Sequence, residues 1–498
     1  MRFLARVLFA GGLLQFATGI VWATTGLAMA ETLSTSRQDY GDARQAIDRG
    51  GWTEYEELRP GLDDYPLAIY LDYFQLSRQA HKVRPVEARR FVSRSEDSPL
   101  PNRFLSVYLH QAGRDKRWAD FLQVMPDEPN SIELKCYYFR AQLARGDKMV
   151  AWEGAERLWV HGKSRPKQCD PLFSAWLKAG KLDDDVVWAR LLKAFDARQR
   201  SLMKYVARKG SSQLQPWSDK LLAVYAKPDT LGDQALPADS PYAADIASHG
   251  LTHLARYSPE EALSLWIGYQ EKLDFSSEQV HSVEYAIALR SLFAKNEANV
   301  PWLQGALARL EEDKLVEIRL RWLLSEQDLP ALQQTLPLLS EEARGDSAWR
   351  YWQAIAQEQS GEHERAREAL QVLAGERGYY SFLAADKLEE PYAFNHQPLV
   401  LEAAAREPLQ QLPAVQRIEE LRFHEEQNLA HSEWYKVLQD TDDADQHQQL
   451  AQLAAEQGWH RMAIDAANRA KAWNALDLRF PTPYEETFKH HGSVQRVP

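Results

Sequence analysis

Apolar residues recur every three or four positions along almost the whole chain, which is the period of one buried face of an α-helix. The stretch 347–373 shows this twice, around Trp349 and Trp352 and again around Ala366, with Gly361 between the two stripes. That pattern predicts a helix, a tight turn and an antiparallel helix. Runs of alternating apolar and polar residues flanked by hairpin turns are missing from the sequence. We therefore expect an all-α fold.

The same turn recurs at irregular intervals. A glycine is followed five residues later by an alanine at Gly146 and Ala151, Gly361 and Ala366, and Gly458 and Ala463. Glycine accepts the left-handed conformation that ends a helix, and the alanine lets the next helix approach closely. This device is typical of tetratricopeptide-like hairpins. The sequence therefore predicts an extended, tetratricopeptide-like α-helical superhelix without a strict repeat length.

Turn-rich stretches suggest how this array is divided. The proline-containing stretch 390–398 separates a long superhelical domain, 31–396, from a small helical linker domain, 397–480. A second polar stretch, 228–241, indicates a boundary inside the long domain. Prolines after residue 480 end the linker domain and leave 481–498 as a short stub.

The first 30 residues are typical of a secretory signal peptide. Arg2 and Arg6 form a basic start, an apolar run follows over 7–27, and Ala28-Met29-Ala30 offers a cleavage site. A membrane anchor is the alternative, but the glycines and threonines of the run and the cleavage site favour removal. No later segment approaches about 18 continuous apolar residues. We expect an exported chain with no membrane span after signal removal.

Length and charge narrow the classes of function. With 498 residues the chain is several times longer than a typical domain of about 100–150 residues, so several domains or one solenoid are expected. The formal net charge is −12 at pH 7, and no local basic run offsets it. Because nucleic acids and anionic membranes attract basic surfaces, neither is an expected partner.

The chain has two cysteines, Cys136 and Cys169. An even, low number in an exported protein favours one disulfide. Two unpaired buried thiols are the alternative. A bond between them would close a loop of a size that stabilises a fold by roughly 3–4 kcal/mol.

Two groups of residues imitate metal sites without meeting their geometry. His424 and His431 are seven positions apart, or about 10 Å along a helix, too far to share one zinc ion. The acidic run 440–445 imitates a calcium loop, but Asp445 stands where that loop needs glycine and Ala451 where it needs glutamate. We interpret the run as a turn between helices, and we predict neither a metal nor a cofactor.

Signals for catalysis are equally weak. No Gly-x-Ser-x-Gly motif or glycine-rich phosphate loop is present. Paired carboxylates cleave glycosidic bonds in many enzymes, but the acidic runs 183–185, 311–312 and 341–342 fall near predicted helix starts, where they favour the dipole. Aromatic side chains stack on sugars, yet many here lie inside apolar stripes, which favours core packing: Trp152, Trp159, Trp188, Trp349 and Trp352.

Several stretches, taken in order, resemble the soluble lytic murein transglycosylases. The resemblance covers about 35–489. Its N-terminal part is carried by 60–67, 70–73, 136–138, 151–152, 158–159, 162–164 and 169–174, and its later part by 349–354, 378–380, 432–434, 457–459 and 478–481. It implies a U-shaped superhelix whose linker helices complete a ring. It also implies that Cys136 and Cys169 are joined and that the protein is periplasmic.

The resemblance further implies a reaction. Family members carry a lysozyme-like catalytic domain that cuts peptidoglycan between N-acetylmuramic acid and N-acetylglucosamine and leaves 1,6-anhydromuramic ends. One glutamate acts first as acid and then as base. It stands in a Glu-Ser pair followed by Gly-Leu-Met-Gln and Asn-Ala-Gly motifs, and none of these occurs in this sequence. We therefore predict no catalytic residue here and no cleavage by this chain alone.

Two hypotheses about the function are compatible with the sequence. The chain is either the superhelical portion of a truncated or split lytic transglycosylase, or a helical scaffold that binds peptidoglycan glycan strands and recruits a catalytic domain or other cell-wall enzymes. An α/α toroid glycosidase with its own carboxylates is disfavoured by the order of the family-like stretches. In the first two readings the helices over 431–480 form a docking platform, and we expect apolar surface around Trp434, Trp459 and Trp473 to be exposed.

Overall fold

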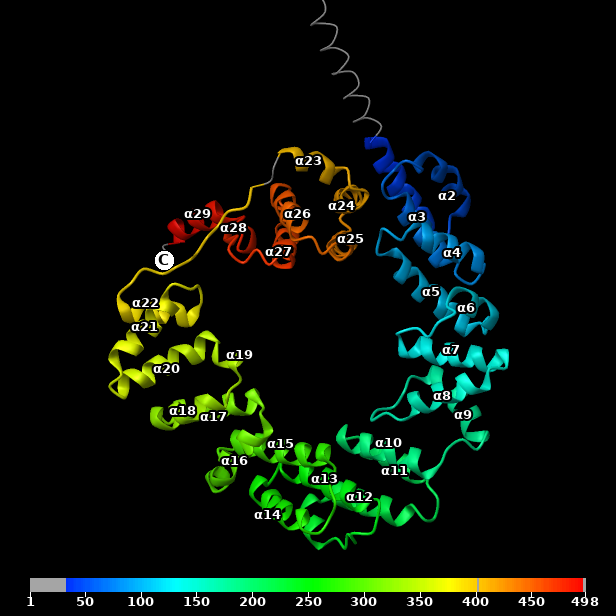
Figure 1. Cartoon of the computed structure of the whole chain (residues 1–498). Coiled ribbons are helices and arrows are strands. Elements are labelled where there is room, and N and C mark those ends of the chain that lie inside the picture. Colours follow the sequence, from blue (N-terminus) through cyan, green and yellow to red (C-terminus); the bar gives the residue numbers. More distant parts are fainter. Residues whose placement is uncertain (1–32, 401–402, 496–498) are drawn as a thin grey trace, which may run out of the picture. The chain divides into compact units, whose positions relative to one another are not determined.

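The computed structural model describes residues 33–400 and 403–495. Within these ranges every regular element is a helix, which confirms the predicted all-α class. Consecutive helices pair as antiparallel hairpins along the chain (Figure 1). The predicted signal peptide, residues 1–30, lies outside the described residues. None of the described helices has a long, nearly uncharged apolar segment of the length that a bilayer requires.

The first compact unit combines the two ends of the described chain, 33–130 and 396–495. Residues 33–49 are helical. The N-terminal part continues with α2 (Trp52–Leu58), η1 (Arg59–Leu62), α3 (Ala68–Arg78), α4 (Pro85–Arg94), α5 (Leu100–Arg114) and α6 (Trp118–Val124). The C-terminal part comprises α23 (Ala403–Gln410), α24 (Pro413–Phe423), α25 (Gln427–Gln439), α26 (Ala444–Glu456), α27 (His460–Arg469), α28 (Leu476–Arg479) and α29 (Glu485–Gln495).

The second compact unit is the continuous segment 131–395. Its first half contains α7 (Ile132–Arg145), α8 (Lys148–Trp159), η2 (Lys167–Cys169), α9 (Asp170–Lys178), α10 (Asp184–Asp196), α11 (Arg200–Ala207), α12 (Gln215–Ala226), η3 (Pro228–Asp233) and α13 (Ala243–Leu254). Its second half contains α14 (Pro259–Gln270), α15 (Ser277–Phe293), η4 (Glu297–Asn299), α16 (Val300–Leu310), α17 (Asp313–Ser325), α18 (Leu329–Thr335), η5 (Leu336–Leu338), α19 (Glu341–Arg344), α20 (Ser347–Gln359), α21 (His363–Ala374) and α22 (Tyr379–Leu388).

The helix-ending turns found by the glycine pattern have the predicted conformation. Gly146, Gly361 and Gly458 all have positive φ, at 102°, 88° and 70°. At Gly361 the backbone N–H bonds to Glu358 O, and the next N–H bonds to Gln357 O. This pair of hydrogen bonds satisfies the last carbonyls of the helix.

The same turn also occurs where the sequence has no glycine. Gln327 has a φ of 59°, its N–H bonds to Leu324 O, and the following N–H bonds to Leu323 O. Equivalent hydrogen bonds surround six charged residues with positive φ: Lys116, Arg198, Lys295, Glu389, Glu425 and Lys471. A left-handed residue other than glycine costs about 1–2 kcal/mol, which the packing of the two helices must offset. The same left-handed turn therefore ends more helices than the glycine pattern predicted.

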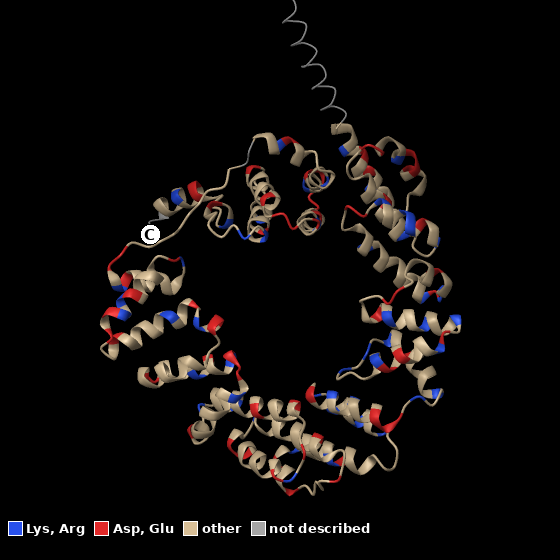
Figure 2. Ribbon diagram, viewed as in Figure 1, with Lys and Arg blue, Asp and Glu red and all other residues tan. Residues whose placement is uncertain are grey.

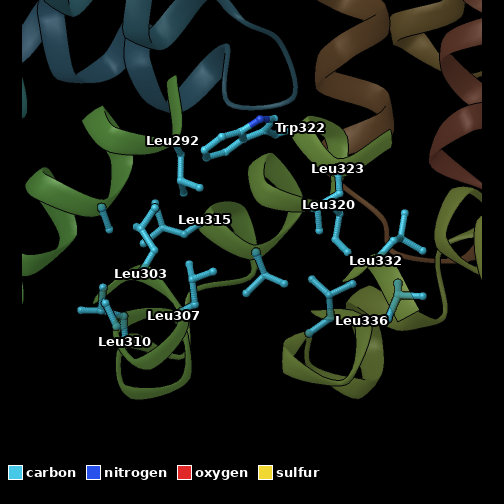
Figure 3. Close-up of a cluster of buried hydrophobic side chains, with 14 of the residues drawn as sticks. Leu292, Leu303, Leu307, Leu310, Leu315, Leu320, Trp322, Leu323, Leu332 and Leu336 are labelled. Carbon is cyan, nitrogen blue, oxygen red and sulfur yellow. The ribbon is translucent and has the colours of Figure 1, made fainter. Parts of the chain in front are cut away.

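A leucine-rich core shows how the hairpins of the second unit bury their apolar faces. Side chains from α15, α16, α17 and α18 point toward one another in Figure 3, among them Leu292, Leu303, Leu315 and Leu332. Leu315 and Leu332 are completely buried, and Trp322 lies at the edge of the group with 4% exposure. Full burial of a leucine contributes about 1.5–3 kcal/mol, so this core is a main source of stability for the second unit.

One predicted boundary is wrong. The stretch 228–241 begins with η3, which packs on α12 and α13 inside the second unit. Leu231 in η3 is fully buried, and its carbonyl accepts a 2.7 Å hydrogen bond from the Tyr269 hydroxyl. Prolines in this stretch mark a short 3₁₀ segment that covers the core, because proline fixes φ without preventing burial.

Candidate functional site

Buried carboxylates are the natural candidates for acid–base chemistry, because burial perturbs their proton affinity. Among the described residues three such side chains are buried: Glu284, Glu420 and Glu433. Glu284 accepts a 3.0 Å hydrogen bond from Arg309 and a 3.4 Å bond from the indole of Trp266. It is therefore held by structural partners. The other two carboxylates belong to the first unit, where they form two polar clusters.

The Glu433 cluster joins α3, α24, α25 and the segment before α5. Glu433 is fully buried and accepts hydrogen bonds from Tyr70 at 2.7 Å and from Arg417 Nε and Nη2, both at 3.0 Å. Arg417 also binds Asp97, through Nη1 to the carboxylate and Nη2 to the main-chain oxygen, both at 2.9 Å. Burial raises the pKa of Glu433, and Arg417 and Tyr70 oppose that effect. With its oxygens enclosed, Glu433 cannot protonate a substrate.

The Glu420 cluster joins helix 33–49, the turn before α3, and α24. Arg37 donates two 2.9 Å hydrogen bonds to the carboxylate of Glu420, and the Tyr65 hydroxyl donates a third at 2.6 Å. The Tyr65 oxygen lies 3.0 Å from His424 Nε2, so His424 carries its proton on Nε2 in this arrangement. The Tyr40 ring packs on His424 with centroids 4.6 Å apart.

Proton affinities in this second cluster follow from its partners. Burial alone would raise the pKa of Glu420, but the hydrogen bonds from Arg37 and Tyr65 outweigh it and hold that pKa below its usual 4.5. Burial, reinforced by the Arg37 charge, lowers the pKa of His424 below 6.5. Both clusters link residues more than 300 positions apart, and no sequence signal could have matched those partners.

The histidines and the acidic run that imitate metal ligands in the sequence have ordinary structural roles. His424 is part of the Glu420 cluster, and His431 Nδ1 lies 2.8 Å from Gln427 O on its own helix. Asp443 caps α26 through bonds from the N–H groups of Asp445 and Gln446, so the acidic run 440–445 is a turn between helices as predicted. Over the described chain no three His, Cys, Asp or Glu side chains are grouped so that they could hold a metal.

The acidic runs have mixed roles at helix ends. Asp183 caps α10 through a 2.9 Å bond from Val186 N, as predicted. Glu341 lies in the first turn of α19, where Ser340 is the cap. Glu311 and Glu312 lie directly before α17, as predicted, and Glu311 also ends α16 in a left-handed conformation with a φ of 52°.

Several tryptophans proposed as core residues are indeed buried. Trp159, Trp188 and Trp349 have exposures of 1%, 6% and 3%, whereas Trp152 and Trp352 are half-buried. Cys136 and Cys169 form a disulfide that ties α7 to η2, with Cα atoms 4.8 Å apart. That bond was predicted, and both cysteines are fully buried.

The helices over 431–480, which were predicted to form a docking platform, contain both buried and exposed tryptophans. Trp434 and Trp459 are buried inside the hairpins of α25–α27, where the Trp434 indole donates a 2.9 Å hydrogen bond to Met462 O. Two consecutive hairpins cover both rings, so the exposed apolar surface that was expected around them is not formed by the rings themselves. Trp473 alone of the three is open, at 49% exposure. Further large apolar side chains are exposed beyond it: Phe480, Tyr484, Phe488 and Val494.

Charge is distributed without a strongly basic segment. Figure 2 shows Lys and Arg interspersed with Asp and Glu along the helices of both units. This pattern agrees with the formal net charge of −12 and offers no phosphate-binding stripe.

Comparison with known proteins accounts for this arrangement of helices. The model of the soluble lytic murein transglycosylase L domain matches residues 408–476. The soluble lytic murein transglycosylase of Escherichia coli is 28% identical over 487 residues, covering 97% of this chain and 75% of that protein. A putative soluble lytic murein transglycosylase of Haemophilus influenzae is 32% identical over 207 residues, covering 41% and 33% of the two chains.

Solved structures of lytic transglycosylases are similar to this chain in fold as well as in sequence. The 70 kDa soluble lytic transglycosylase of Escherichia coli matches with a TM-score of 0.79 and 28% identity, covering 93% of this chain and 75% of that one. An inactive variant of the lytic transglycosylase Slt of Pseudomonas aeruginosa matches with a TM-score of 0.77 and 29% identity, covering 92% and 75%. Helix order, the matched region in the first unit and coverage of nearly the whole chain lead to one conclusion: over almost its full length this chain is similar to the soluble lytic murein transglycosylases.

Proposed function

We propose that these 498 residues form the superhelical portion of a periplasmic peptidoglycan lytic transglycosylase, the part that engages glycan strands while a separate domain cuts them. The observation that carries the proposal is the structural match at a TM-score of 0.79 over 93% of the chain. In this family the reaction cleaves the bond between N-acetylmuramic acid and N-acetylglucosamine and forms 1,6-anhydromuramic ends. Peptidoglycan is accordingly the proposed ligand.

The same proposal holds that this chain alone does not cleave peptidoglycan. Glycosidic cleavage requires an accessible proton donor with a suitably raised pKa. The family's Glu-Ser, Gly-Leu-Met-Gln and Asn-Ala-Gly motifs do not occur in the sequence. Within the described residues, the three buried carboxylates are committed to arginine, tryptophan or tyrosine partners. These observations support the absence of a catalytic residue from residues 1–498.

We further propose the division into a signal peptide over 1–30, a superhelical domain over 31–396, a linker domain over 397–480 and a short segment over 481–498. The change of unit at His396 supports the second boundary. Export to the periplasm rests on the basic start, the apolar run and the small residues before Glu31. Removal of the first 30 residues is tested by N-terminal sequencing of the protein recovered from a periplasmic extract.

The experiment for peptidoglycan uses the chain without its signal peptide and intact murein sacculi. Co-sedimentation measures binding, and mass spectrometry of the soluble fraction measures anhydromuropeptides. We expect the chain to sediment with sacculi and to release no anhydromuropeptides. Absence of binding contradicts the proposed ligand, and release of anhydromuropeptides contradicts the proposed lack of catalysis.

A second role is favoured by the exposed apolar side chains near α29. Phe480, Tyr484 and Phe488 have exposures of 64%, 66% and 74%. Contiguous apolar surface is typical of docking sites. We propose that this segment docks a lytic transglycosylase catalytic domain. Light scattering with such a domain from a family member tests this, with the variant Phe480→Ser/Tyr484→Ser/Phe488→Ser as control. We expect complex formation by the original chain alone. Equal association by both proteins contradicts the role.

A further inference from the structure

The second unit contains a cavity of about 550 Å³ that the proposed function does not use. It is lined by residues of α8, α9, α10 and α11 and of the loop between α8 and η2. Its volume falls within the range of small-molecule sites, about 300–1,000 Å³. Two arginines, Arg165 and Arg190, are the cationic groups in its wall, and Asp170 is the carboxylate.

Arg190 is unusual because it is a buried charge without an acidic partner. The residue is 4% exposed, and its Nε has no hydrogen-bond partner. The guanidinium lies 4.3 Å from the centroid of the Trp159 ring. In the described chain no carboxylate forms an ion pair with Arg190 or contributes to its proton affinity, and the Tyr205 hydroxyl is the group that opposes the fall in its pKa. Burying an ion without a counterion is destabilising, and a cation–π contact offsets only part of that cost.

The nearby positive charge of Arg165 further disfavours the charged form of Arg190. Its Nε–H donates a 2.8 Å hydrogen bond to Leu158 O, which holds the guanidinium in place without neutralising it. Burial lowers the pKa of Arg190 to about 10, and the nearby charge of Arg165 adds to that effect. Burial also lowers the pKa of Arg165. Two cations therefore share one cavity wall, and neither forms an ion pair with Asp170, the carboxylate of that wall.

We propose that this cavity binds a small ligand through a carboxylate group, which pairs with Arg190 and Arg165. Guanidinium groups bind carboxylates and phosphates through paired hydrogen bonds. The charge balance favours the carboxylate. Two arginines opposed by Asp170 leave one positive charge in the wall, which one carboxylate neutralises and a phosphate dianion would exceed.

The rest of the wall indicates what the carboxylate is attached to. Ser164, Ser174 and Ser201 present hydroxyl groups that can donate to or accept from amide groups. Phe173, Leu177, Leu202 and Tyr205 supply apolar surface. A short peptide with a free carboxyl terminus combines these features, because it has a carboxylate, an amide backbone and small apolar side chains. The class of ligand is therefore a carboxylate-terminated peptide.

The competing explanation is purely structural, with Arg190 retained for its contact with Trp159. The two explanations differ in what Arg190→Met does to the unliganded protein. If the role of Arg190 is to bind an anionic ligand, its replacement removes an uncompensated charge and leaves the thermal stability of the unliganded protein unchanged or higher. If the contact with Trp159 is the whole role, the replacement lowers thermal stability.

The test measures binding by calorimetry and thermal stability for the full chain without its signal peptide. The probes are acetyl-Ala-Ala, its C-terminal amide and inorganic phosphate. The variants are Arg190→Met, Arg165→Met and, as a control on the same helix as Arg190, Lys193→Met, which is exposed. We expect acetyl-Ala-Ala to bind, the amide to bind at least tenfold more weakly, and each arginine variant to lose at least tenfold in affinity.

Lys193→Met should bind like the original protein, and Arg190→Met should melt at the same or a higher temperature without ligand. Equal binding of the acid and the amide overturns the carboxylate site. Tighter binding of phosphate overturns the assigned chemistry. A lowered melting temperature for Arg190→Met, together with unchanged binding, returns Arg190 to a structural role.

Discussion

Arg417 and Glu433 face each other across α24 and α25 with two parallel hydrogen bonds of 3.0 Å each. Glu433 has no exposed surface, and Arg417 is 5% exposed. The remaining donors of Arg417 reach Asp97, and the remaining donor to Glu433 comes from Tyr70. One ion pair of the linker helices therefore fixes two segments from the N-terminal part of the same unit. The clusters at Glu433 and Glu420, together with a 2.7 Å hydrogen bond from Arg103 to Ser432, are polar contacts between the two ends of the described chain.

We predict that Arg417→Met strongly destabilises the first unit. Loss of Arg417 leaves the buried carboxylate of Glu433 without a counterion, and breaking a buried pair on one side costs about 3–5 kcal/mol. Urea unfolding of the full chain measures the effect. The matched control is Arg406→Met, which breaks an exposed ion pair with Glu456 and should cost less than about 1 kcal/mol. Similar losses in the two variants would mean that the burial of Glu433 is unimportant. The double variant Arg417→Met/Glu433→Gln should recover part of the loss.

We predict that acid weakens the first unit in two steps. The native pKa values of His424 and Glu420 are both below their ordinary values of 6.5 and 4.5. The unfolded chain therefore binds protons more readily at each site. Each group contributes stability above its ordinary pKa, and this contribution is lost as the pH falls through its native pKa. Urea midpoints should fall first below pH 6.5 and further below pH 4.5.

Two variants separate these steps. His424→Gln should flatten the upper part of the pH profile, and Glu420→Gln should flatten the lower part. Both variants should already be less stable at neutral pH, because each leaves Tyr65 with a poorer partner. A profile that keeps the same shape in both variants would show that other groups cause the acid sensitivity.

We predict opposite effects for two Gly→Ala substitutions in the second unit. Gly361 has a φ of 88°, so Gly361→Ala should lower stability by about 1 kcal/mol. Gly268 lies in α14, and an added methyl group would meet nothing within 4 Å. Gly268→Ala should raise stability by about 0.5–1 kcal/mol, because alanine loses less backbone entropy in a helix. Thermal unfolding of both variants checks the signs. A loss at both positions would show that crowding and not backbone conformation decides the outcome.

We predict that removing the disulfide lowers the stability of the second unit by roughly 3–4 kcal/mol. The cysteines are 33 positions apart, and the chain-entropy model gives this magnitude for a loop of that length. Urea unfolding of Cys136→Ala/Cys169→Ala against the oxidised protein measures it. Thiol titration of the denatured, unreduced protein should find no free thiol. Two titratable thiols would contradict the bond itself.

Particular residues show what the sequence could predict. The periodic apolar stripes around Trp349 predicted helices, because helical burial repeats with a local period that one segment carries by itself. Gly146, Gly361 and Gly458 predicted turns, because a positive φ is a property of a single residue. The disulfide followed from the number of cysteines and the expected export. The core positions of Trp159, Trp188 and Trp349 also followed from local spacing.

Other features depended on neighbours that are distant in the sequence. His424 looked like a failed metal ligand, but its role is set by Tyr65 and Glu420. Trp434 and Trp459 lie in helices that were expected to carry exposed apolar surface, but two consecutive hairpins bury both rings. The turn at Gln327 was not predicted, because packing imposes a left-handed conformation that a residue with a side chain does not favour.

The sequence by itself determined the helices, the glycine-containing turns, the disulfide and the family resemblance, because these depend on local backbone preference and on residue order. The tertiary structure decided which charges meet. Arg37 pairs with Glu420 and Arg417 pairs with Glu433, whereas among the described residues no carboxylate forms an ion pair with Arg190. The physical reason is that electrostatic interactions depend on distance in space and on burial, and neither can be read from separation along the chain.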